Sequence, residues 1–273
     1  MASTTRNIPL ILALLLWCTL ALCAVKSSED SSKISISNDR LAFSVSKSSG
    51  AITTLSLDGQ DLLGSGTGPY LDCHCTAEGF WTPGNGGTLK LFQGTDSTGK
   101  AYAGARVSNN YQNSGKVLEQ YWFLKDGETG IHVFSRAKYS NSSVTSGGDL
   151  GELRVLFRPN TGSLWTHLSS SDEMYAPLPD TSGAPTVQDA TWYVGGKKDH
   201  PYVKQMSDYF TKYMFSETWR EQKVHGLFND GSKSKDGSTF GAWLVMNTKD
   251  TYFGGPTQSD LTVDGIVYNY VGE

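Results

Sequence analysis

The chain has 273 residues, of which 27 are acidic and 23 are basic, so its formal net charge is −4. This mild acidity comes without a basic run or patch that could neutralise phosphates, which argues against nucleic-acid binding. Thirty glycines and 13 tyrosines are spread along the chain, a composition typical of many turns between aromatic-rich strands.

Residues 1–24 have the features of a targeting segment. Arg6 is their only charged residue, and an apolar run that begins at Ile8 ends in small residues. This pattern predicts a secretory signal peptide that is removed near residue 24. The alternative is an uncleaved membrane anchor, but the run barely reaches the roughly 20 apolar residues that a spanning helix needs. We therefore expect an extracellular protein that makes no contact with a membrane.

The remaining residues, 25–273, predict one β-rich domain. Apolar and polar residues alternate from Ile34 to Val45, which is the period of half-buried strands. Turn dipeptides follow such segments: Asp58-Gly59 predicts a hairpin, and Asp126-Gly127 separates two further strands. Helical patterns are weak, and the best candidate, 203–210, is short. The sequence thus predicts an antiparallel all-β sandwich that is a monomer.

Beyond residue 24 the chain has two cysteines, Cys73 and Cys75, on either side of His74. A disulfide across one intervening residue is possible, and so is metal binding. A second pair that could complete a tetrahedral site is absent from the sequence, so we expect neither a metal nor a cofactor. Asn141-Ser142-Ser143 matches an N-glycosylation acceptor, which requires a secreted chain.

Arg154 and Arg158 lie four residues apart on a predicted strand, and even spacing would place both on one sheet face. They could simply be solvated surface residues, because exposed arginines are common. They could also clamp a carboxylate, since a guanidinium donates two parallel hydrogen bonds to it.

Two further segments contain candidate site residues. Lys212 is a surface lysine on base rates, although a lysine can act as a base when burial or a cationic neighbour lowers its pKa. His225, next to Gly226, is expected to be a structural histidine. Tyr268 and Tyr270 alternate on a predicted strand that follows the turn Gly254-Gly255-Pro256.

In these motifs the chain resembles the rhamnogalacturonan lyases of polysaccharide lyase family four. The similarity runs from about Ile34 onward and is most specific in 151–158, 211–226, Gly254-Gly255-Pro256 and the Tyr268-X-Tyr270 pair. The resemblance implies a galactose-mutarotase-like super-β-sandwich. It also implies cleavage of the rhamnose–galacturonate backbone of pectin, rhamnogalacturonan I, by β-elimination, so an acidic polysaccharide is the expected partner.

The resemblance also implies a role for each residue. Lys212 matches the general base that removes the C5 proton of galacturonate. Arg154 matches the arginine that neutralises the uronate carboxylate, and Tyr268 and Tyr270 match tyrosines that contact the substrate. Arg158, the second arginine of the possible carboxylate clamp, is also expected to bind substrate. Arg154 and Lys212 are therefore expected on the same concave sheet face.

One departure from the family pattern concerns the general acid. The family's acid is a histidine in a Gly-His pair shortly after the second tyrosine, and in this register it would fall just past Glu273. We therefore expect the catalytic domain to be incomplete and the 273-residue chain to bind substrate weakly with negligible turnover.

Two other functions fit the same residues. The first is an inactive carbohydrate-binding relative that keeps the sandwich and the arginine clamp. The second is an epimerase-like protein, for which His225 with Glu217 or Glu221 is the local acid–base candidate. Only a lyase would create an ultraviolet-absorbing C4–C5 double bond.

Overall fold

The structure is a computed structural model. It describes residues 25–76, 79–139, 152–160, 164–170, 173–181, 183–188, 191–196, 200–201, 203–206, 208–215, 224–245, 257–262 and 265–271. Within these residues the chain folds into antiparallel sheets, and its helical structure is limited to the short η1, Tyr111–Asn113. No helix in this part of the chain is long and apolar enough to cross a membrane. The predicted all-β class is confirmed.

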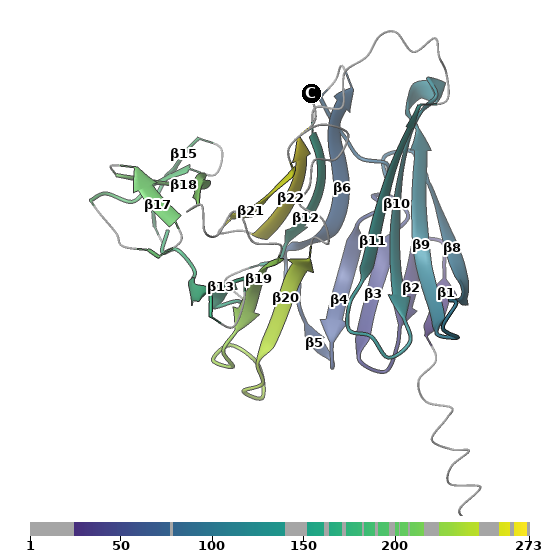
Figure 1. Cartoon of the computed structure of the whole chain (residues 1–273), viewed down its shortest axis with the longest axis horizontal. Helices are drawn as coiled ribbons and strands as arrows, with labels where there is room; N and C mark the ends of the chain where they lie inside the picture. The colour runs from purple at the N-terminus through teal and green to yellow at the C-terminus, as the bar shows by residue number, and fades with distance from the viewer. Residues whose placement is uncertain are drawn as a thin grey trace, which may run out of the picture.

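Two sheets built from residues 26–139 face one another (Figure 1). The first sheet contains β1 (Lys26–Glu29), β2 (Lys33–Ser37), β3 (Leu41–Ser46), β4 (Ile52–Leu57) and β5 (Gln60–Asp61). The second contains β8 (Thr88–Thr95), β9 (Ala101–Asn110), β10 (Lys116–Lys125) and β11 (His132–Tyr139).

The alternating residues of the sequence supply the core between these sheets. Ile34, Phe43 and Trp122 are completely or almost completely buried there. The indole Nε1 of Trp122 donates a hydrogen bond to the Gly50 carbonyl oxygen at 3.2 Å, so its polar atom is satisfied. The turn expected at Asp58-Gly59 joins β4 to β5, and both residues have positive φ (50° and 80°), as a tight hairpin requires.

A third sheet combines strands that are far apart in the sequence. It contains β21 (Thr257–Thr262), β22 (Gly265–Val271), β12 (Glu152–Arg158), β6 (Thr67–Thr76) and β7 (Gly79–Trp81), in that order. In β6, Cys73 and Cys75 form a disulfide, which was one of the two alternatives for this pair. The predicted strands around Arg154 and around Tyr268 are confirmed and are direct neighbours.

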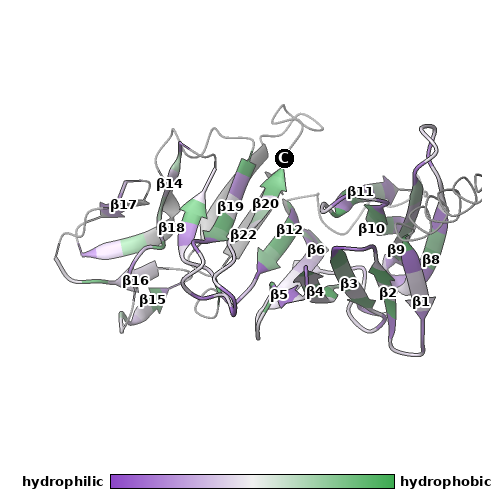
Figure 2. Ribbon diagram, turned by 90° about the horizontal axis from the view of Figure 1, so that it is seen from below, coloured by the Kyte–Doolittle hydropathy of each residue, from purple (hydrophilic) through white to green (hydrophobic). Residues whose placement is uncertain are grey.

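Two smaller sheets complete the architecture. One contains β14 (Tyr175–Pro177), β13 (His167–Ser169), β19 (Val224–Asn229) and β20 (Phe240–Val245). The other contains β15 (Thr186–Gln188), β16 (Thr191–Tyr193), β18 (Tyr209–Phe215) and β17 (Val203–Met206). Figure 2 shows that apolar residues run along β12 and β20.

The helix considered for 203–210 is wrong. This segment instead forms β17 and the start of β18, which pair antiparallel with Met206 opposite Tyr209. The segment is too short to bury a helical face, and its valine and aromatic residues favour an extended backbone.

The outer face of the β8–β11 sheet shows how a glycine can set the packing of its neighbours. Gly104 in β9 lies between Phe92 and Phe123 in the register. The two rings pack edge to face with centroids 6.1 Å apart and close over the glycine. A Cβ atom at position 104 would collide with the Phe92 ring and with the Cβ of Phe123, and it would lie 2.5 Å from the Trp122 carbonyl oxygen.

We therefore predict that Gly104→Ala lowers the free energy of unfolding by about 1–3 kcal/mol, because an added methyl overpacks a filled site. Urea denaturation of the purified chain measures this change. Gly130→Ala is the matched control, since an ideal Cβ there meets no described atom within 4 Å. Equal stability of the two variants would contradict the packing described here.

Candidate active site

The strands that hold the predicted site residues lie side by side. β12 holds Arg154 and Arg158, and it pairs with β22, which holds Tyr268 and Tyr270. β22 pairs with β21, and β18, which holds Lys212, packs beside β21. Figure 1 shows β18 to the left of the sheet that contains β21, β22 and β12, and the contact with β21 is what links it to that sheet. The side chains of Lys212, Tyr268 and Tyr270 lie outside the described part of the chain, so the shared face expected for Arg154 and Lys212 stays a prediction.

The register fixes which positions align across β12. Arg154 is opposite Asp72 on one side and opposite Asn269 on the other. Tyr268 is opposite Val155, and Tyr270 is opposite Leu153. Because directly opposed positions belong to the same sheet face, Arg154 shares its face with positions 72 and 269. Positions 268 and 270 alternate with position 269 along β22, so they belong to the opposite face of the sheet.

Arg154 is held by a bidentate ion pair. Its Nε and Nη2 atoms each donate to a carboxylate oxygen of Asp72 at 2.7 Å. The two side chains are only 17% and 11% exposed, so water screens the pair weakly. The guanidinium also lies over the ring of Phe80, with its Cζ 3.7 Å from the centroid. These contacts fix the orientation of the planar group.

Arg158 differs from Arg154 in its surroundings. The register of β12 against β6 shifts between Leu156 and Arg158, so the even spacing of the two arginines does not by itself place them on one face. Its Nε is buried and has no hydrogen-bond partner in the part of the chain that the structure describes.

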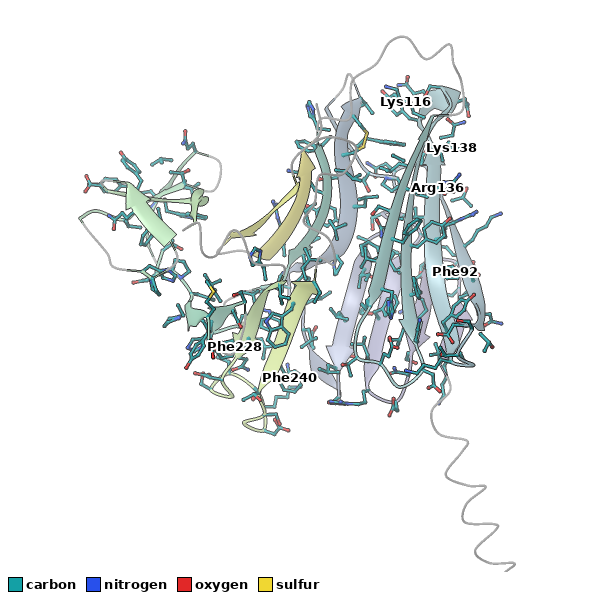
Figure 3. The ribbon with its side chains drawn as sticks, viewed as in Figure 1. Phe92, Lys116, Arg136, Lys138, Phe228 and Phe240 are labelled. Carbon is teal, nitrogen blue, oxygen red and sulfur yellow. A yellow bond between two sulfur atoms is a disulfide. The ribbon has the colours of Figure 1, made fainter. Side chains whose placement is uncertain are left out.

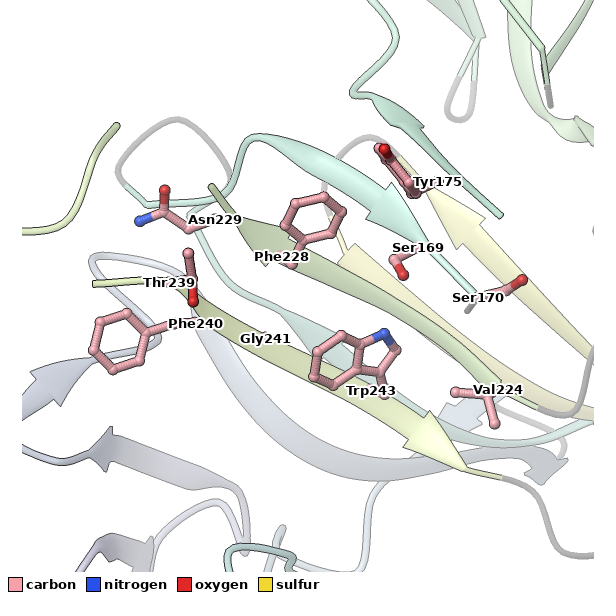
Figure 4. Close-up of a pocket in the computed structure, with 10 residues that line it drawn as sticks. All are labelled: Ser169, Ser170, Tyr175, Val224, Phe228, Asn229, Thr239, Phe240, Gly241 and Trp243. Atoms are coloured by element: carbon pink, nitrogen blue, oxygen red, sulfur yellow. The ribbon is translucent and has the colours of Figure 1, made fainter. Parts of the chain in front are cut away.

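A pocket of about 570 Å³ lies over the β13–β14–β19–β20 sheet (Figure 4). Sequence analysis did not identify its lining, which is Ser169, Ser170, Tyr175, Val224, Phe228, Asn229, Thr239, Phe240, Gly241 and Trp243. Phe228 is stacked on His167 at 4.6 Å between centroids, and Tyr175 packs edge-on against both rings. Four of the ten lining residues are aromatic, and the pocket is large enough for a sugar ring.

Trp243 is seated on two glycines. It is the cross-strand partner of Gly226, and a Cβ at either Gly226 or Gly241 would collide with its indole ring. The absence of side chains at these positions lets the indole lie across the sheet, while 47% of the residue stays exposed. An exposed indole held in one orientation is a surface on which the C–H face of a pyranose can pack.

His225 belongs to the other side of β19. It is buried, and it alternates with the pocket residues Val224 and Phe228 along the strand. Leu227, which shares its parity, is a fully buried core residue. This burial agrees with the structural role expected for His225. Glu217 and Glu221, its possible partners in an epimerase, lie outside the described residues. The turn at 254–256 and the acceptor at Asn141 lie outside them as well.

Comparison with known proteins assigns the chain to a family. The domain family described as "Probable rhamnogalacturonate lyase B middle domain" matches residues 164–258. A protein of Aspergillus oryzae described as "Probable rhamnogalacturonate lyase C" is 55% identical over 251 residues, which cover 90% of this chain. The chain belongs to the rhamnogalacturonate lyase family. The recognition made from the sequence motifs is confirmed.

Further relatives agree with the first. "Rhamnogalacturonate lyase B" of Emericella nidulans is 53% identical over 93% of this chain. The chain spans 36% of the length of the A. oryzae relative and 39% of the E. nidulans relative, so it represents less than half of each lyase. Residues 164–258, which the domain family matches, include the aromatic pocket and β18. The arginines of β12 precede this range.

The Asp72–Arg154 pair generates a stability prediction. Asp72→Ala should lower the free energy of unfolding by about 2–3 kcal/mol, because it leaves a largely buried guanidinium without its carboxylate. Urea denaturation measures the loss. Arg40–Asp58 is the matched control, since it is also bidentate but has side chains that are 54% and 44% exposed. Arg40→Ala, which breaks this exposed pair and leaves the turn residue Asp58 in place, should change stability little. Similar losses in both variants would contradict the importance of burial.

The pocket generates a binding prediction. Trp243→Ala should weaken binding of a neutral rhamnose-containing oligosaccharide about tenfold, because it removes the stacking surface. Titration calorimetry measures the affinity. Val245→Ala is the control, since Val245 is exposed on the same strand and does not line the pocket. If both variants bind equally well, the indole is not a sugar platform.

Proposed function

We propose that this chain provides substrate binding and the general base of a secreted lyase that cleaves rhamnogalacturonan I by β-elimination. The observation that carries the proposal is the assembly of β12, β22, β21 and β18 in a chain 55% identical to a rhamnogalacturonate lyase. The candidate base, the arginines and the tyrosines are all on these neighbouring strands. Secretion is part of the proposal and rests on the targeting pattern of residues 1–24.

The chemistry assigns one task to each group. Lys212 takes the C5 proton of galacturonate, the C5–H electron pair forms the C4–C5 double bond, and the glycosidic bond to O4 breaks. The departing oxygen takes up a proton from a general acid. Removal of the C5 proton is feasible only when the charge that develops on the C6 carboxylate is stabilised, and this is the task of the arginines.

The charges on β6 and β12 suit a single uronate. Asp72 neutralises one of the two arginines, so Asp72, Arg154 and Arg158 together leave one positive charge. Asp72 also holds Arg154 in a fixed orientation through its Nε and Nη2 side, and a preorganised guanidinium stabilises developing charge better than a mobile one. We propose that Arg154 and Arg158 bind the uronate. Tyr268 and Tyr270 alternate with the position opposite Arg154, so they belong to the other face of this sheet, and their contact with the substrate stays a prediction from the family resemblance.

The aromatic pocket gives the proposal a second element. The backbone of rhamnogalacturonan alternates a charged uronate with rhamnose, whose C6 is a methyl group. A site for this polymer needs a cationic subsite and an apolar subsite. The arginines of β12 are suited to the first, and the pocket over β19 and β20 is suited to the second.

Catalysis can be tested in a chimera in which these residues replace the matching part of the A. oryzae relative. The chimera should release oligosaccharides with an ultraviolet-absorbing double bond from rhamnogalacturonan. Lys212→Ala should reduce turnover about 10²–10⁴-fold while substrate affinity changes little, which is the usual contribution of a positioned base.

Lys235→Ala, a change at an exposed lysine in the β19–β20 loop, is the matched control and should leave turnover unchanged. A chimera that binds the polymer but releases no unsaturated product would favour the alternative function, a carbohydrate-binding relative without turnover. Full activity of Lys212→Ala would remove the assignment of Lys212 as the base.

A further inference from the structure

The outer face of the β8–β11 sheet combines cations and aromatic rings. Four basic residues occupy outer-face positions at one end of the sheet: Lys90, Arg106, Arg136 and Lys138. An aromatic cluster adjoins them: Phe92, Tyr102, Tyr121, Phe123 and Phe134, with His132 stacked on Phe123 at 4.8 Å. Figure 3 labels Arg136 and Lys138 near one end of this sheet and Phe92 further along it.

The cations of this face outnumber its acids. Glu119 is buried between Arg136 and Arg106. Its carboxylate oxygens lie 3.1 Å from Nη1 of Arg136 and 4.0 Å from Nη1 of Arg106. Ser108 and Tyr121 each donate a 3.3 Å hydrogen bond to the same carboxylate. One carboxylate thus positions two guanidinium groups and neutralises one of them, so this end of the sheet keeps a net positive charge in an acidic protein.

The face is also accessible. Phe134 is 54% exposed, and the side chain of Arg136 is 49% exposed. The row Lys90–Arg106–Tyr121–Phe134 crosses all four strands, which corresponds to about 14 Å at the usual strand spacing. This length accommodates several sugar residues of an extended chain.

We propose that the outer face of β8–β11 is a second binding surface for an acidic polysaccharide, separate from the candidate active site. Arg106, Arg136, Lys90 and Lys138 pair with uronate carboxylates, since a guanidinium fork matches a carboxylate. The exposed ring of Phe134 packs against the C–H faces of the sugars. The identity of the polymer as a pectic one rests on the proposed function. Charge complementarity selects an acidic chain over a neutral one.

The surface would keep the protein on a long substrate between cleavage events. A polymer bound at two places gains an effective concentration at each, so a weak second surface still raises retention on long chains. Short oligosaccharides cannot reach both places, and their binding should not depend on this face.

The test uses the 273-residue chain in affinity electrophoresis through gels that contain polygalacturonate or neutral galactan. The chain should be retarded by polygalacturonate, and the retardation should weaken as salt rises, because exposed charges are screened over about 8 Å at physiological ionic strength. The triple variant Lys90→Ala, Arg136→Ala, Lys138→Ala should bind polygalacturonate about tenfold more weakly. Phe134→Ala should show a smaller loss.

A matched triple variant controls for net charge. Lys26→Ala, Arg40→Ala, Lys235→Ala removes the same number of exposed cations from other parts of the chain and should bind like the unaltered protein. Equal retardation of the two triple variants, or equal retardation of the unaltered chain by galactan, overturns the proposal. Sedimentation that shows a change of oligomeric state in the first variant, without a loss of polymer binding, would make the face a contact between copies and would also overturn it.

A separate experiment tests the lyase proposal. In the chimera, the first triple variant should cleave short oligosaccharides at the unaltered rate. If the chimera releases no unsaturated product, the lyase proposal fails while the result of the electrophoresis still decides the binding surface.

Discussion

The pairing of β12 with both β6 and β22 determines where the candidate site residues lie. Three segments, each separated from the next by tens of residues, become neighbours in one sheet through this strand. A largely buried bidentate pair between Arg154 and Asp72 joins β12 to β6, and a slip of one residue in the register would separate its partners. The ion pair therefore specifies the register, and the register specifies which positions can meet a substrate together.

Glycines in the strands play a comparable part on two other sheets. Gly104 makes room for rings from both neighbouring strands, which close over it and form a layer on an outer face. Gly226 and Gly241 make room for a single indole, that of Trp243, which stays half exposed above them. In both places an absent side chain is used to orient an aromatic one. The first arrangement covers the backbone, and the second forms one side of a pocket.

The strands were predictable where their patterns were strong. Alternation identified β2 and β3, and the Asp58-Gly59 dipeptide identified a hairpin, because both signals are local. The segment 203–210 was misjudged because a run of a few residues does not separate a strand from a helical turn, and only its pairing decided the matter. The family was also recognisable, since its motifs are short and ordered along the chain.

The detailed geometry of the site was not predictable from the sequence. Asp72 lies 82 residues before Arg154 and has no motif that marks it as a partner. Spacing along β12 suggested that Arg154 and Arg158 share a face, but the register shift near Leu156 is a property of the pairing with β6. The aromatic pocket combines four strands and two loops, and its glycines look like ordinary turn residues in the sequence.

The most direct test of the central claim is a crystal structure of the Lys212→Ala chimera with a bound rhamnogalacturonan oligosaccharide. The account predicts a galacturonate whose carboxylate contacts the Arg154 guanidinium, whose C5 faces position 212, and whose neighbouring rhamnose approaches Trp243. An oligosaccharide bound on the opposite face of β12, with no contact to the Arg154 guanidinium, would contradict it.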